Sequence, residues 1–314
     1  MILYHAISSF QLLKVMLHRM KFHKKEKAVL LLPDFIQTKY PDYLKIQELK
    51  IFDEVYLFPY LFIEHNRETL EKNLENAYNK NIPYNIHSFS EIYVAGIHFY
   101  FSLYLINQAK KFIAFEDAPN ILCRHDVLYY ELKKVFPVHA EIAKENKLFS
   151  GENKYIKQII VLNKCKTVLK KQKKFNVRKS MKRLSRKKKN LILQFFISKQ
   201  YEVKEQDTIL LTQRFSVNGI MSEDEQINLY QVMVREMLDE KRLIIKPHPD
   251  ETIDYQLLFP KSLVISNTVP SELLLYICNK KPKYVITIDS MAKEYLQKDF
   301  EVITYNLEDI KSKI

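Results

Sequence analysis

Short apolar segments alternate with amphipathic segments along most of the chain. The apolar segments are three to five residues long and rich in Ile, Val, Leu and Phe, as in strands that are buried on both faces. In the first part of the chain they occupy residues 2–4, 28–32, 54–58, 91–95, 112–115 and 158–162. Two intervening segments, 9–21 and 67–79, show helical periodicity.

The pattern breaks at a basic stretch, residues 166–189, and then starts again. Strands are predicted at 208–212, 243–246, 263–265 and 284–288, with a helix over about 223–240. Strand, helix and strand at this spacing imply right-handed crossovers and a mostly parallel sheet covered on both faces. We therefore predict an α/β protein of two Rossmann-like domains, 1–200 with the basic connector 166–189, and 201–314, joined near residues 190–205.

The composition supports two folded domains. The 314 residues are 47% hydrophobic, which is enough for two buried cores. The longest apolar segment, 95–106, is shorter than the roughly 18–20 residues of a membrane span and predicts a buried helix. Residues 1–10 lack the pattern of a secretory signal, so we expect a cytoplasmic protein. The three cysteines, Cys123, Cys165 and Cys278, are odd in number and far apart, which predicts core thiols.

Glycine is scarce enough to exclude two classes of phosphate-binding loop. The chain has only Gly96, Gly151 and Gly219, and no two lie close together. Neither a GxGxxG motif nor a P-loop can therefore be present. A phosphate must be held by side chains, helix N-termini or turns without glycine, and no dinucleotide cofactor is expected.

The positive charge is concentrated in one segment. The net charge is +13, and residues 166–189 contain 13 Lys or Arg and no Asp or Glu. Outside this segment, the remaining 37 basic residues equal the 37 acidic ones. A run of basic residues can simply be a solvated linker or helix face. A run of this density favours an anionic partner: a phospholipid surface, an acidic glycan or a nucleic acid.

Ligands of open α/β sheets bind at the carboxyl ends of the strands, so polar residues there are the first candidates. Glu116 and Asp117 follow the predicted strand 112–115 directly. Either carboxylate could accept the proton of an attacking sugar hydroxyl. Asp117 could equally be a helix N-cap.

A histidine between two prolines follows the predicted strand 243–246. Pro247 and Pro249 restrict the backbone and would present His248 at the strand end, beside Lys246. A histidine in this position can donate a hydrogen bond to a leaving phosphate. A purely structural histidine is the alternative.

Two further strand ends offer nucleotide ligands. Ser271 and Glu272 suit a helix start, where Glu272 could bind ribose hydroxyls or simply cap the helix. Thr287, Asp289 and Ser290 precede a predicted helix over 291–296, a geometry that suits a phosphate.

Together these motifs resemble bacterial sialyltransferases of glycosyltransferase family 52 and the capsular polysialyltransferases. The resemblance covers most of the chain and is carried by short segments in the same order: residues 8–13, the pair Glu116 and Asp117, the pair Thr212 and Gln213, the pair His248 and Pro249, and Ser290. It departs at Ala118, where that group has glycine, and at Asp289, where a second hydroxyl residue is expected.

The resemblance implies a GT-B fold, two Rossmann-like domains whose parallel sheets face a central cleft. It also implies sugar transfer from a CMP-activated donor to a glycan or glycolipid, by inverting displacement without a metal. Asp117 would be the base, with Glu116 as the nearest substitute, and His248 would assist the departing phosphate. We expect the protein to act in surface polysaccharide or lipooligosaccharide synthesis and to be bound peripherally at the inner face of the cell membrane.

Three other functions fit part of the pattern. A CDP-alcohol phosphotransferase of the teichoic-acid type also has a histidine-proline element, and UDP or GDP sugars are alternative donors. An RNA-binding protein would use the basic segment, but residues 166–189 contain only Phe175 for base stacking.

Overall fold

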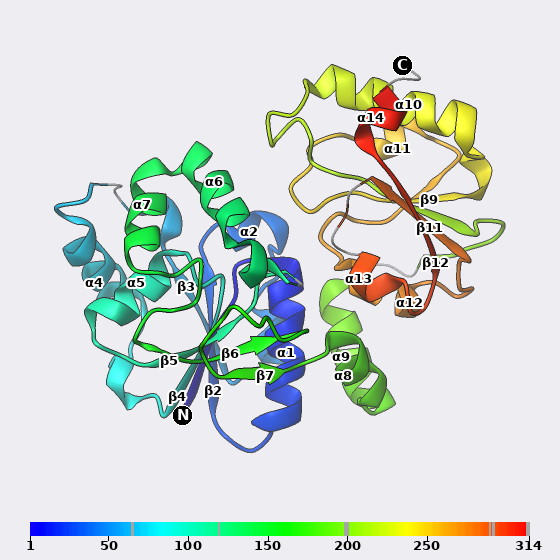
Figure 1. Ribbon diagram of the computed structural model, residues 1–314. Coiled ribbons are helices and arrows are strands. Elements are labelled where there is room, and N and C mark those ends of the chain that lie inside the picture. The colour runs from blue at the N-terminus through cyan, green and yellow to red at the C-terminus, as the bar shows by residue number, and fades with distance from the viewer. Residues whose placement is uncertain (64–65, 119, 198–200, 289, 291–292, 312–314) are drawn as a thin grey trace. The chain divides into compact units, whose positions relative to one another are not determined.

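The structure is a computed structural model that describes residues 1–314 except 64–65, 119, 198–200, 289, 291–292 and 312–314. The chain divides into two compact units, Met1–Leu191 and Ile192–Ile314 (Figure 1). Each contains one parallel sheet, as the alternation of apolar and amphipathic segments predicts.

The first unit has a seven-stranded sheet in the order β3-β2-β1-β4-β5-β6-β7, and all neighbouring strands are parallel. Six of these strands were predicted and one, β7, was not. The strands are β1 (Ile2–His5), β2 (Ala28–Pro33), β3 (Glu54–Phe58), β4 (Glu91–Ala95), β5 (Phe112–Phe115), β6 (Ile156–Val161) and β7 (Gln172–Lys174).

Helices cover both faces of this sheet. Successive side chains of β1 point to opposite faces. Leu3 packs in the core formed with α4 and α5, whereas the Tyr4 ring meets His18 of α1. The helices of the unit are α1 (Ser9–Phe22), α2 (Ile36–Lys39), α3 (Lys45–Glu48), α4 (Leu70–Asn81), α5 (Tyr100–Asn107), α6 (His125–Val135), α7 (Pro137–Glu145), α8 (Val177–Arg183) and α9 (Arg186–Phe196), the last of which crosses into the second unit.

The basic stretch is a folded part of the first unit and not only a connector. Strand β7 extends the sheet beside β6, and α8 packs against α1. The apolar residues Phe175, Val177 and Met181 are buried, so they are not available for insertion into a membrane. None of the 13 basic side chains is buried. The apolar side chains of the stretch therefore lie in the interior, and its charged side chains lie at the surface.

The second unit has a five-stranded parallel sheet in the order β10-β9-β8-β11-β12. Its strands are β8 (Thr208–Leu211), β9 (Leu243–Lys246), β10 (Leu263–Val264), β11 (Tyr284–Ile288) and β12 (Glu301–Tyr305). Its helices are α10 (Glu223–Met237), α11 (Tyr255–Leu258), α12 (Leu274–Ile277), α13 (Lys293–Leu296) and α14 (Leu307–Lys311). Helix α10 starts with a capping box in which Ser222 and Glu225 satisfy each other's backbone N–H.

No helix within the described ranges is long and apolar enough to cross a membrane. The apolar segment 95–106 does not form one continuous helix. Ala95 ends β4, Gly96 has a positive φ of 72°, and α5 starts only at Tyr100. The predicted buried helix is thus confirmed in its second half only.

The prediction that all three cysteines are free thiols is wrong. Cys123 lies in the 3-10 turn Ile121–Arg124 that follows β5, and it forms a disulfide with Cys165 in the loop after β6. The strands β5 and β6 are neighbours in the sheet, so the loops that follow them meet at one edge. The two cysteines are 42 residues apart in the sequence, so the sequence alone does not indicate that they are close in space. Cys278 is free.

Thiol counting tests the disulfide. Alkylation of the denatured protein without reductant should label Cys278 alone, and reduction should raise the count to three by mass spectrometry. Reduction should also lower the free energy of unfolding by about 2–4 kcal/mol, because an open chain has more conformational entropy when unfolded. In Cys123→Ser, the count without reductant should rise to two. Three labels on the unreduced wild type would contradict the pairing.

Candidate functional site

Asp117 lies at the carboxyl end of β5, where it receives three contacts from neighbouring strand ends. The N–H of Gly96 donates to its Oδ1 at 3.0 Å, and the side-chain amide of Gln11 donates to the same oxygen. Nδ1 of His98 lies 3.0 Å from Oδ2. A carboxylate has about four lone-pair positions. Among the contacts within the described residues, one position on Oδ2 therefore remains for a further donor.

The environment of Asp117 keeps it ionised. Burial raises the pKa of this carboxyl, but the charge and hydrogen bond of His98, the charge of Lys14 and the Gly96 N–H hold the pKa below its ordinary value. The side chain is 12% exposed. Asp117 is thus a nearly buried, ionised acceptor at the edge of the sheet.

The loop after β1 and the start of α1 supply the groups that hold this edge. Ser8 caps α1 by accepting from the N–H of Gln11. The Gln11 side chain accepts from the Ile7 N–H at 2.9 Å and donates to Asp117. One turn later, the Lys14 ammonium group donates to the backbone carbonyl of Glu116. The predicted segment 8–13 is therefore in contact with the predicted carboxylate.

Glu116 points into the interior instead of the strand end. Its Oε2 accepts from the Leu162 N–H at 3.1 Å, and its Oε1 is buried without a hydrogen-bond partner among the described residues. Burial raises the pKa of this carboxyl. With 2% of the residue exposed, Glu116 bridges β5 and the loop after β6 and is poorly placed to reach a substrate.

The histidine-proline segment forms a tight loop after β9. The backbone N–H of His248 donates to the Thr212 hydroxyl at 3.1 Å and to Glu251 at 2.8 Å. The backbone N–H of Asp250 donates to Nδ1 of His248 at 3.2 Å. Because Nδ1 accepts this bond, the neutral imidazole carries its proton on Nε2. The side chain is 27% exposed, so this proton can be offered to a ligand.

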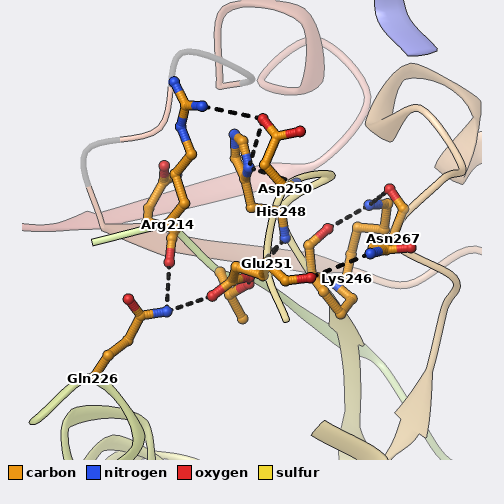
Figure 2. A network of polar contacts seen from close by, with 10 residues as sticks. Arg214, Gln226, Lys246, His248, Asp250, Glu251 and Asn267 are labelled. Atoms are coloured by element: carbon orange, nitrogen blue, oxygen red, sulfur yellow. Dashed lines mark hydrogen bonds and ion pairs between the residues drawn. The ribbon is translucent and has the colours of Figure 1, made fainter. Parts of the chain in front are cut away.

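Glu251 organises the loop from below (Figure 2). Its Oε1 accepts from the Gln226 amide and from the Tyr255 hydroxyl, and its Oε2 accepts from the Thr212 hydroxyl and the His248 N–H. Burial raises the pKa of Glu251, while these donors oppose the increase. The carboxylate thereby ties helix α10, the end of β8 and the histidine-proline loop together.

Lys246 and Glu272 add opposite charges to the same region. Lys246 is buried, and its ammonium group donates to the carbonyls of Pro247 and, at 3.2 Å, Asn267. Burial lowers the pKa of Lys246 to about 7, although Glu272 and Glu251 favour its charged form. Glu272 therefore lies close enough to Lys246 to affect its pKa.

The remaining predicted ligands are placed unequally. Gln213 follows β8 with its backbone held by Tyr230 and Gln226, and Ser271 starts a short 3-10 turn. Pro249 is partly exposed and Ser290 is 9% exposed. Asp289 lies outside the described residues.

Thr287 lies inside β11, where the predicted strand 284–288 places it, and not beyond the strand end where a phosphate ligand was expected. The β-branched residues Thr287 and Ile288 continue the strand and pair with Thr304 and Tyr305 of β12. The Thr287 hydroxyl is buried and makes no hydrogen bond within the described part of the chain. The predicted helix 291–296 is described only as α13 (Lys293–Leu296).

Several site residues were not found from the sequence: His98 and Lys14 around Asp117, and Arg214, Gln226 and Glu251 around His248. Arg214 pairs with Asp250 at 3.1 Å beside the imidazole. These residues lie in helices or loops without a motif. Only Glu251 carried a signal, because it follows the two prolines.

Comparison with known proteins gives a family and a fold. The model of glycosyltransferase family 52 matches residues 20–307. A Haemophilus influenzae protein described as uncharacterized is 43% identical over 84 residues, which is 27% of each chain. The chain thus matches about a quarter of that relative's length.

Similar solved structures share the fold. An α/β-galactoside α-2,3-sialyltransferase of Photobacterium phosphoreum has a TM-score of 0.52 and 13% identity, covering 99% of this chain and 92% of that one. The Medicago truncatula protein UGT71G1, solved with UDP-glucose, has a TM-score of 0.51 and 9% identity, covering 97% and 79%. The two parallel sheets are therefore those of a GT-B fold, as predicted.

The Glu251 network gives a stability prediction. Each Glu251 oxygen accepts from one nitrogen that can only donate. Oε1 accepts from Nε2 of Gln226, and Oε2 accepts from the backbone N–H of His248. In Glu251→Gln, the new amide NH₂ must oppose one of them in either orientation. Urea titration should show a free energy of unfolding about 1–3 kcal/mol lower than in the wild type.

The exposed Glu205 in the same unit provides the matched control. Glu205→Gln should change the free energy of unfolding by less than about 0.5 kcal/mol. Equal stability of the two variants would show that Glu251 does not organise the loop.

Proposed function

This chain belongs to glycosyltransferase family 52, and from that premise we propose that it transfers a sialic-acid-type sugar from a CMP-activated donor to a glycan hydroxyl. The observation that carries the proposal is the His248 loop, in which the Asp250 N–H donates to Nδ1, so that the neutral imidazole carries its proton on Nε2 at the carboxyl end of β9. The direct product would be a glycan extended by one sugar with inverted anomeric configuration.

On the donor side, His248 stabilises the phosphate of CMP as the bond to the sugar breaks. A positioned N–H donor is effective here because charge develops on the phosphate oxygen in the transition state. Ser290 and Asp289 would lie near the phosphate, Ser271 and Glu272 near the ribose, and Thr212 and Gln213 at the adjacent strand end. Lys246 supplies positive charge from beneath the loop.

On the acceptor side, Asp117 is the general base and His98 its positioning residue. The free lone-pair position on Oδ2 can accept the proton of the attacking hydroxyl. His98 holds this oxygen from the other side at 3.0 Å. Glu116, the alternative base, is directed into the interior by its bond to Leu162. Asp117 is therefore the better candidate.

The reaction balances without a redox partner. The acceptor oxygen forms a bond to the anomeric carbon while the bond from that carbon to the phosphate oxygen breaks. The electron pair leaves with CMP, the hydroxyl proton passes to Asp117, and His248 donates to the phosphate. A monophosphate leaving group carries less charge than a diphosphate, so we propose that no metal ion is required.

An anionic partner belongs to this proposal. The basic side chains of residues 166–189 lie at the surface, which suits an anionic membrane or an acidic glycan that carries the acceptor. We propose that the protein works peripherally at the inner face of the cell membrane in surface-glycan synthesis.

A nucleotide panel tests the donor. Excess CMP should raise the melting temperature more than UDP or GDP, since a ligand that binds only the folded state adds about 2.7 kcal/mol at roughly a hundredfold excess over Kd. EDTA should leave sugar transfer nearly unchanged. Equal shifts for all nucleotides, or transfer from CDP-glycerol but not from CMP-sialic acid, would reject the CMP-sugar assignment and favour a phosphotransferase.

Substitution of the base tests the acceptor side. Asp117→Ala should lower kcat by about 100-fold or more while CMP affinity stays nearly constant, because the base acts on the acceptor and not on the nucleotide. Single-turnover transfer and CMP titration measure the two quantities. Near-normal turnover would remove Asp117 from the mechanism.

The pH profile of His98→Asn separates positioning from folding. The charge of His98 opposes the effect of burial on Asp117. Without it, the pKa of Asp117 should rise, so the acid limb of the kcat profile should move to higher pH. The exposed His87 is the control, and His87→Asn should leave the limb in place. A lower kcat with an unshifted limb would make His98 merely structural.

A further inference from the structure

Three elements of the first unit bring cations together around one exposed aromatic ring. Lys21 and Phe22 end helix α1, Lys173 lies in β7, and Arg183 ends α8. Helices α1 and α8 pack against each other, and β7 forms the edge of the sheet. We call these four residues the basic patch. Only Lys173 and Arg183 belong to the basic stretch of the sequence.

The geometry of the basic patch is compact. The ammonium nitrogens of Lys21 and Lys173 lie 4.9 and 4.5 Å from the centre of the Phe22 ring. Phe22 remains 39% exposed between them. Within the described part of the chain, no carboxylate forms an ion pair with Lys21, Lys173 or Arg183.

The cations of the patch repel one another. Burial, followed by the charges of Arg183 and Lys173, lowers the pKa of Lys21. An anion bound among the three would relieve this repulsion, which is the physical requirement for an anion-binding surface.

An exposed leucine identifies the kind of anion carrier. Leu169 lies in the loop that leads into β7, four residues before Lys173, and it is 90% exposed and followed by Lys170 and Lys171. An aliphatic tip among lysines suits a bilayer interface, where apolar groups enter the headgroup region while cations meet phosphates. Leucine cannot stack on a nucleic-acid base, and an acidic glycan offers it no apolar surface.

We propose that the basic patch, together with Leu169, docks the protein on an anionic bilayer, with lipid phosphates between Lys21, Lys173 and Arg183. Gln11 near the other end of α1 contacts Asp117, and Phe22 lies eleven positions further along the helix, about 16 Å along the axis. Docking therefore leaves Asp117 uncovered. In combination with the proposed sugar transfer, this favours the outer sugars of a membrane-anchored glycolipid as acceptor.

Vesicle sedimentation of the full chain tests the docking surface. With vesicles of equal parts phosphatidylcholine and phosphatidylglycerol, the triple variant Lys21→Gln, Lys173→Gln, Arg183→Gln should bind about 100-fold more weakly, since each cation near an anionic surface corresponds to about a fivefold change. The control replaces the exposed Lys72, Lys80 and Lys134 by Gln and loses the same charge. It should bind nearly as the wild type does.

Leu169→Ser separates a bilayer from other polyanions. It should weaken vesicle binding severalfold and leave binding to heparin or single-stranded RNA unchanged. Equal vesicle binding by the triple and control variants would overturn the proposal. The proposal would also be overturned by a second pattern of results. In this pattern, Leu169→Ser binds vesicles as the wild type does, and the triple variant loses heparin binding and vesicle binding in parallel, which indicates a general polyanion surface. Neither donor nor acceptor is present, so these results are independent of the proposed transfer reaction.

Discussion

A carboxylate that is removed from water needs hydrogen-bond donors, and the strand-end sites of both units are built on this requirement. In the first unit, Asp117 collects donors from the first turn of α1 and from the residue that follows β4. In the second, Glu251 collects them from α10, the end of β8 and the histidine-proline loop. Loss of such a donor leaves a buried charge unsatisfied, so each carboxylate restricts the segments around it.

The two carboxylates have different consequences for chemistry. Asp117 keeps one acceptor position and 12% exposure, and His98 helps to keep it ionised. Glu251 is 6% exposed and all its contacts are with protein groups, so it shapes the loop that presents His248. In a chain with three glycines, polar side chains and two prolines thus fix the shape of a strand-end loop without a glycine-rich segment.

The basic stretch shows how folding separates properties that the sequence mixes. Its apolar side chains, such as Val177 and Met181, are buried by packing within the first unit, while its cationic side chains remain at the surface. Tertiary structure then adds Lys21 and Phe22, which lie far away in the sequence, to the surface that these cations form. The resulting patch has an aromatic centre that the stretch alone does not possess.

The sequence by itself determined the alternation of strands and helices, most strand positions, the strand-end placement of Asp117 and His248, and the exclusion of glycine-rich loops. These depend on local periodicity and on which residues directly follow a strand. Tertiary structure decided which distant groups meet. His98 reaches Asp117, Gln226 reaches Glu251, and Cys123 reaches Cys165. Such contacts arise from strand order and helix packing, which no local pattern of residues encodes.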